Sequence, residues 1–152
     1  MSERQHAWNR TLAVDEHGNT IPPKHHVLRY VSLAEGVDPA EPRQPFAEAL
    51  ATLESALAWG PEGLLFTVGY SPAYFDRFET SLPESVDLPE PTRMTGLESG
   101  VVFDEVDVLV HLASDRPDVL LEAEEGLFGD RETVNGVEMP SLEGLFEFPD
   151  YD

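Results

Sequence analysis

The chain has 152 residues, with 30 acidic side chains against 9 basic ones and a formal net charge of −21. This length suits one domain with a real core and is too short for two large domains. The acidity argues against nucleic acid and anionic membrane surfaces as partners, because both are bound through clustered lysine and arginine.

Two explanations of the acidity compete, disorder and adaptation to high salt. Hydrophobic residues make up 41% of the chain and recur periodically, which argues against disorder. Molar salt shortens the Debye length to roughly 3 Å, so a dense carboxylate surface then repels itself weakly. Lys24 is the only lysine. We therefore expect a halophilic protein.

The chain contains no cysteine, which excludes disulfides, thiolate metal sites and a cysteine nucleophile. Residues 1–10 lack the apolar core of a secretory signal. No apolar run approaches the ~20 residues of a membrane span. If Met1 is the true start, the sequence predicts a cytoplasmic protein.

The first elements follow a polar lead at residues 1–23, which ends in two prolines. Residues 24–33 predict a strand, because they are rich in Val, Leu and Tyr. A helix is predicted over residues 42–59, with Gly60-Pro61 as its stop signal. Its apolar stripe has helical spacing and consists of Phe46, Ala49, Leu50, Leu53, Ala56 and Leu57.

A second strand is predicted at residues 64–70, which are apolar on both faces and therefore central or covered. Ser71 predicts the N-cap of a short helix that reaches Phe78, with proline at its first position. Residues 80–104 hold three prolines and little periodicity, so we expect a long irregular insertion there.

The last elements begin with a strand predicted at residues 106–113. Ser114 or Asp115 is expected to cap a second long helix, which has Pro117 in its first turn. An Asn135-Gly136 pair predicts a two-residue hairpin turn, and residues 145–148 a final strand.

The order of these elements predicts an α+β, ferredoxin-like βαββαβ fold. Its four-stranded antiparallel sheet carries the helices on one face and a long insertion between the second and third strands. Two right-handed crossovers would place the first and third strands side by side. We expect one domain over residues 24–148, after the polar lead and before a tail at 149–152.

Histidines are the residues that could carry a site. In the third strand, Asp107, Leu109 and His111 alternate onto the face that the helices leave open. His25 and His26 are adjacent in the first strand, so one of them shares that face. We take His111 and His26 as cofactor-binding candidates; no metal site and no catalytic residue is assigned. The alternative is a partly buried, hydrogen-bonded histidine.

Several short sequence segments carry a family resemblance. They are Arg4 to Asn9, Asp15 to Asn19, Pro23 to Val27, Gly63 to Phe78, Leu82 to Pro91 and Val110 to Asp115. The strand-turn at Gly63 to Phe78, followed by the strand at Val106 to Asp115, resembles the N-terminal half of dye-decolourising (DyP-type) haem peroxidases. Taken together, these segments resemble those of uncharacterised haloarchaeal DyP-like proteins that often carry a Tat export signal.

The resemblance implies a ferredoxin-like domain that lacks the catalytic half of its family. In DyP enzymes a GxxDG motif supplies the distal aspartate and a histidine in a second domain binds the iron. Neither the GxxDG motif nor that second domain is identifiable in this chain. Whether the chain is an enzyme is therefore left open, and we expect no cofactor to be bound by it alone. Haem binding is expected only after completion by a C-terminal half.

The open sheet face predicts a partner, either a second copy in a homodimer or a separate C-terminal-half chain. Two alternatives to a peroxidase-related half stay open. One is a non-catalytic dimeric binding or assembly module. The other is a small haem-binding or monooxygenase-like dimeric enzyme of the ferredoxin-like type.

Overall fold

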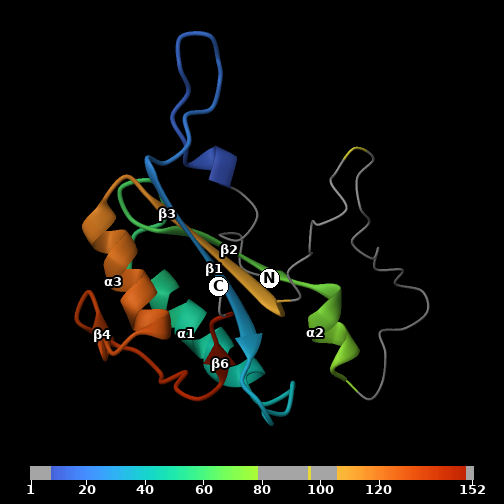
Figure 1. Cartoon of the computed structure of the whole chain (residues 1–152). Coiled ribbons are helices and arrows are strands. Elements are labelled where there is room, and N and C mark those ends of the chain that lie inside the picture. Colours follow the sequence, from blue (N-terminus) through green and yellow to red (C-terminus); the bar gives the residue numbers. More distant parts are fainter. Residues whose placement is uncertain (1–7, 79–95, 97–105, 150–152) are drawn as a thin grey trace.

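The computed structural model describes residues 8–78, 96 and 106–149. Helices α1 (Arg43–Ala56) and α3 (Pro117–Phe128) lie on the same side of a four-stranded antiparallel sheet (Figure 1). The sheet order is β2-β3-β1-β6, and its strands are β1 (His25–Leu33), β2 (Leu65–Tyr70), β3 (Val108–Ser114) and β6 (Phe146–Glu147). The predicted α+β class and four-stranded antiparallel sheet are confirmed.

β1 and β3 pair along seven residues at the centre of the sheet, from His25 opposite Ser114 to Val31 opposite Val108. Successive side chains of a strand point to opposite faces. In β3, Val108, Val110 and Leu112 are therefore buried beneath the helices, whereas Leu109 and His111 point the other way and are partly exposed. This alternation agrees with the one read from the sequence.

The apolar stripe of α1 lies in the core as predicted, but the helix ends at Ala56 rather than at Trp59. Leu57 has extended backbone angles, with φ −118° and ψ 142°. Its side chain is only 8% exposed and joins the core cluster. The chain therefore turns inward three residues before the Gly60-Pro61 stop signal, because burying Leu57 favours that turn.

The sequence predicts a second strand that is central or covered; β2 is not central, since it forms an edge of the sheet, but its first half is covered. Leu65 and Phe66 are buried, but Thr67, Gly69 and Tyr70 are exposed. The apolar composition of β2 reflects covering of its first half only.

The short helix α2 (Pro72–Asp76) begins as predicted, because the Ser71 hydroxyl accepts a hydrogen bond from the backbone N–H of Tyr74 at 3.3 Å. The helix is two residues shorter than expected and ends before Phe78. Proline at its first turn costs no hydrogen bond there.

The sequence predicts that Asp107 lies on the sheet face that the helices leave open. Its side chain is instead fully buried, which corrects that expectation. One carboxylate oxygen accepts the backbone N–H of Leu33 at 2.7 Å. The other accepts the Arg77 guanidinium, also at 2.7 Å. A buried carboxylate needs such partners, so Asp107 ties the end of β1 to the segment that follows α2.

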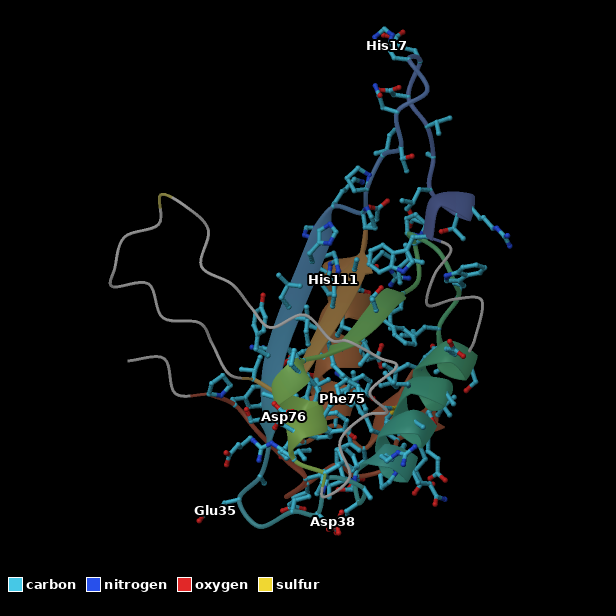
Figure 2. All side chains as sticks on the ribbon, turned by 90° about the vertical axis from the view of Figure 1, so that its right-hand side faces the viewer. His17, Glu35, Asp38, Phe75, Asp76 and His111 are labelled. Atoms are coloured by element: carbon cyan, nitrogen blue, oxygen red, sulfur yellow. The ribbon has the colours of Figure 1, made fainter. Side chains whose placement is uncertain are left out.

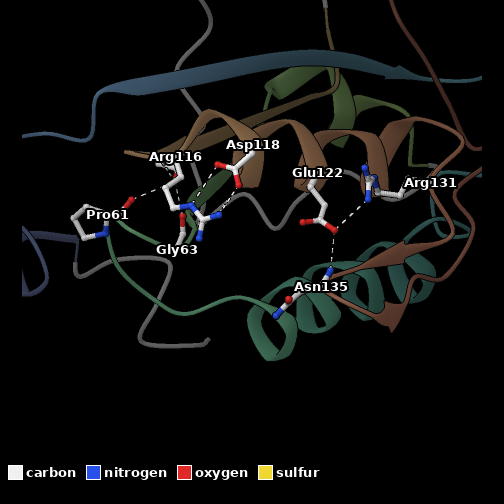
Figure 3. A network of polar contacts seen from close by, with 8 residues as sticks. Pro61, Gly63, Arg116, Asp118, Glu122, Arg131 and Asn135 are labelled. Atoms are coloured by element: carbon white, nitrogen blue, oxygen red, sulfur yellow. Dashed lines mark hydrogen bonds and ion pairs between the residues drawn. The ribbon is translucent and has the colours of Figure 1, made fainter.

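The predicted side-chain cap of the last long helix is wrong. The N-cap of α3 is Arg116, which makes no side-chain capping bond. The Ser114 hydroxyl instead donates to the Gly63 carbonyl at 2.6 Å and accepts the Arg116 N–H at 3.0 Å (Figure 3). The Asp115 carboxylate accepts the Lys24 N–H at 2.8 Å. The Ser114 and Asp115 side chains thus connect the end of β3 by hydrogen bonds to Gly63 and Lys24, which are distant in the sequence.

The Asn-Gly hairpin turn is confirmed between β4 (Thr133–Val134) and β5 (Val137–Glu138). Asn135 and Gly136 have the positive φ values, 47° and 77°, that this turn requires. Asn135 also donates to the Ala56 carbonyl at 2.6 Å, and its N–H donates to Glu122, which pairs with Arg131 (Figure 3). The hairpin is therefore joined to the end of α1 and to the middle of α3.

The described part of the N-terminal lead begins with the 3-10 helix η2 (Trp8–Arg10). It continues into the narrow excursion that stands out from the sheet in Figure 1, where Val14 bridges Thr20. The Asp15 carboxylate accepts three hydrogen bonds, from the side chain and N–H of Asn19 and from the N–H of His17. The Asn19 bonds are the main reason that the pKa of Asp15 is lowered.

Some sequence predictions fall outside the described residues. The insertion at 80–104, apart from Gly96, and His6 are among them.

Truncation of the fully buried Leu53 in α1 tests the core. We expect Leu53→Ala to lower the free energy of unfolding by about 2–5 kcal/mol, because it leaves a cavity. Denaturant unfolding at constant high salt measures this change. Leu121→Ala is the matched control, since Leu121 is 56% exposed on α3. Equal losses in the two variants would contradict the described core.

Removal of the buried Asp107 carboxylate tests its contacts with Leu33 and Arg77. We expect Asp107→Ala to destabilise the domain by about 3 kcal/mol, because the Leu33 N–H loses its acceptor and Arg77 its partner. Asp118→Ala removes an exposed ion pair with Arg116 and should leave the unfolding midpoint nearly unchanged. Similar midpoints for both variants would argue against the buried role of Asp107.

Candidate functional site

The sheet face opposite α1 and α3 consists of three rows of side chains across β1, β3 and β2. The rows are His26–Ala113–Leu65, Leu28–His111–Thr67 and Tyr30–Leu109–Gly69. We call this surface the open face. Leu28 is 49% exposed and Tyr30 38%, whereas Leu65 and Ala113 are buried at one end of the face. Figure 2, turned by 90°, labels His111 on this sheet. The open face thus presents apolar side chains around a histidine.

His26 and His111 are brought together as diagonal neighbours on adjacent strands. His26 Nδ1 lies 2.9 Å from His111 Nε2, and the ring centroids are 5.1 Å apart. A ring nitrogen lies roughly 1.2 Å from its own centroid, so the rings meet edge to edge and not face to face. His25 points to the opposite face of the sheet from His26 and therefore does not contact His111 in this pair. The sequence prediction that one of His25 and His26 shares a face with His111 is therefore realised by His26.

A backbone carbonyl fixes the protonation pattern of the pair. His26 Nε2 lies 2.9 Å from the Pro23 carbonyl oxygen. A carbonyl only accepts, so His26 carries its proton on Nε2 and offers a lone pair at Nδ1. In the neutral pair, the proton between the rings therefore belongs to His111 Nε2.

Trp8 completes the site from the N-terminal lead, and sequence reasoning missed it. Its ring lies 5.1 Å from the His111 ring, inclined by 48°. Its indole N–H donates to the Phe66 carbonyl of the edge strand at 3.3 Å. A tryptophan in an otherwise polar lead is the signal that could have indicated this contact, because such a side chain rarely stays solvated.

The pKa of His111 is lowered, first by burial and then by the nearby charge of His26. Burial disfavours the imidazolium because it loses hydration, and a second imidazolium beside it adds repulsion. His111 therefore stays neutral to lower pH than an ordinary histidine.

The two histidines do not by themselves form a haem pocket. Their facing nitrogens are bound to each other, and His26 is exposed. A cavity of 610 Å³ lies between the end of α3 and residues 139–148, and no histidine lines it. Within the described ranges, no group of three or more His, Asp or Glu side chains could hold a metal ion.

The open face is free of exposed carboxylates among its described residues, although the chain carries a net charge of −21. Two carboxylates continue its register at the ends of β3: Asp107 is buried and paired with Arg77, and the partly exposed Asp115 accepts the Lys24 N–H. The nine residues that form the three described rows thus include no carboxylate.

These features define a small mixed α+β domain in which α1 and α3 cover one sheet face, while no described helix of comparable length covers the other. The chain belongs to the family described as "Family of unknown function (DUF7405)", which matches residues 23–151. No curated protein and no solved structure matches the chain. Among the described residues, no helix is both long and apolar enough to cross a bilayer.

The lowered pKa of His111 predicts a pH dependence of stability. Above about pH 6.5 the folded and unfolded states both keep this histidine neutral, so its contribution is fully present. As the pH falls below that value the unfolded chain binds the proton more readily, and stability is lost. Stability should therefore fall less in His111→Gln than in the native chain between about pH 7 and pH 5.

Denaturant midpoints over this pH range, at constant salt, provide the measurement. The matched control is His17→Gln, which changes an exposed histidine of the N-terminal excursion. Parallel midpoint curves for His111→Gln and the native chain would refute the expected contribution.

Proposed function

We propose that this chain is a non-catalytic docking domain whose open face binds a second copy of itself. The observation that carries the proposal is the carboxylate-free open face with exposed Leu28 and Tyr30. Apolar patches without charge mark interaction surfaces more often than ordinary solvent-facing surface.

The fold is proposed to be ferredoxin-like. β1 and β2 are joined through α1, and β3 and β6 through α3, with the order β2-β3-β1-β6. This is the arrangement of two interlocked split βαβ units. Sheets of this kind have one face covered by helices, so the other needs solvent-tolerant residues or a partner.

Charge favours a second copy as the occupant. A basic partner would be attracted to the acidic surfaces of this chain, not to a face that lacks carboxylates. Two copies that meet through their open faces keep their acidic surfaces outside the contact. Such a two-fold contact is self-complementary, and about 800 Å² buried on each chain would make a stable interface.

The acidic surface also supports the proposal that this protein works at high salt concentration. At low ionic strength two chains of −21 each repel one another. Molar salt screens that repulsion within roughly 3 Å.

The resemblance to the N-terminal half of DyP-type peroxidases supports a related but incomplete protein. Under this reading, haem would be bound only by an assembly that includes a C-terminal half. His111 and His26 are then the candidate cofactor-binding residues of this chain. A small haem-binding enzyme of the dimeric ferredoxin-like type is the second candidate, favoured by His111 at the centre of the open face.

The docking proposal predicts a dimer in molar salt at micromolar concentration, measured by sedimentation equilibrium. Leu28→Glu and Tyr30→Glu should each weaken dimerisation more than about 30-fold, because each places a charge in the contact. Leu121→Glu, on exposed α3, is the matched control and should leave it unchanged. A monomer under these conditions would refute the proposal.

Haemin titration separates the other candidates. A saturable Soret shift that is lost in His111→Ala would support the haem-binding enzyme instead. A heteromer that forms only with a separate chain would support the C-terminal-half partner.

A further inference from the structure

We propose that His26 and His111 form half of a site for a divalent transition ion such as Zn²⁺, which the same pair from a second copy completes. The inference rests on the proposed docking of two open faces. It starts from two imidazole nitrogens that lie 2.9 Å apart on the sheet face opposite α1 and α3. Imidazole is a preferred ligand of zinc, copper and nickel.

His26 is already held as a metal-binding histidine would be. Histidines that bind metals almost always donate their other ring N–H to a carbonyl, a carboxylate or water. His26 Nε2 has this contact with the Pro23 carbonyl, at 2.9 Å. Its Nδ1 lone pair is thereby directed toward His111.

His111 can offer a second lone pair without losing a proton. In the neutral pair its proton is on Nε2, between the rings. Transfer of that proton from Nε2 to Nδ1 changes the tautomer but not the charge. Both facing nitrogens then present lone pairs to a metal ion.

The spacing of the two nitrogens requires only a small change, whereas each ring must turn by roughly 35° to aim its lone pair at a shared tetrahedral ion. With Zn–N bonds of about 2.05 Å at a tetrahedral angle, two ligand nitrogens lie about 3.3 Å apart. The observed separation is 2.9 Å, so the rings must separate by a few tenths of an ångström and rotate. His26 is exposed and would make most of this movement about its contact with the Pro23 carbonyl, whereas His111 packs against Trp8.

Two ligands are too few for a closed zinc site, which normally has four. The described part of the chain offers no third histidine or carboxylate in reach of the pair. A two-fold axis through the open face would add a second His26 and His111, because an isologous contact brings the same residues together twice. Four neutral imidazoles leave the ion with its full charge, which the surrounding −21 of each chain favours.

The test uses metal-free protein in molar sodium chloride, with ZnCl₂ as the probe. Native mass spectrometry and sedimentation equilibrium should give one zinc ion per two chains. The dimerisation constant should rise about 100-fold when free zinc reaches 100 times its dissociation constant. Co²⁺ in place of Zn²⁺ should give the intense visible absorption of a tetrahedral ion.

Matched variants identify the ligands. His26→Ala and His111→Ala should each weaken zinc binding more than about 100-fold, since each removes two of four ligands from the dimer. His25→Ala changes the neighbouring histidine with the opposite alternation and should bind zinc like the native chain. Circular dichroism checks that all three variants are folded.

The outcomes separate this inference from the docking proposal. A dimer whose stability is unaffected by zinc or by the histidine substitutions would overturn the metal site and leave docking in place. Zinc bound by monomers, or retained by both histidine variants through surface carboxylates, would also overturn the metal site. A chain that neither dimerises nor binds zinc would refute both proposals.

Discussion

The antiparallel pairing of β1 with β3 is the contact on which the rest of the structure depends. It fixes seven residues of each strand opposite one another at the centre of the sheet. A strand has a period of two, so a slip by one residue would exchange its faces completely. Val108, Val110 and Leu112 would then leave the core, and His111 would enter it. The hydrophobic core and the candidate site are therefore two results of one register.

The same alternation explains which features could be predicted from sequence. Local patterns identified β1, β3 and both long helices, because burial of one face leaves a regular trace in the residues. The alternation along the strands also placed His111 and one of the two adjacent histidines on a common face, because strand geometry alone decides which face a side chain occupies. The Asn135-Gly136 turn was predictable because few other residues adopt its positive φ values.

Contacts between segments far apart in the sequence could not be predicted in this way. Asp107 is buried because Leu33 and Arg77 supply its partners, and neither residue is near it in the chain. Ser114 has the composition of a helix cap, yet its hydroxyl binds Gly63 instead. Trp8 lies 58 residues from the carbonyl that it binds. In each case tertiary contacts outweigh a local preference, and local patterns carry no information about the partner.

The distribution of charge has a consequence for the speed of encounters. Carboxylates are numerous over the molecule as a whole but absent from the exposed described residues of the open face. Two such molecules repel one another least when these faces approach, so their electric fields would orient them before contact. Ionic strength would then act mainly on the rate of association, which depends on long-range fields. The lifetime of a complex would depend instead on the apolar area that Leu28 and Tyr30 contribute.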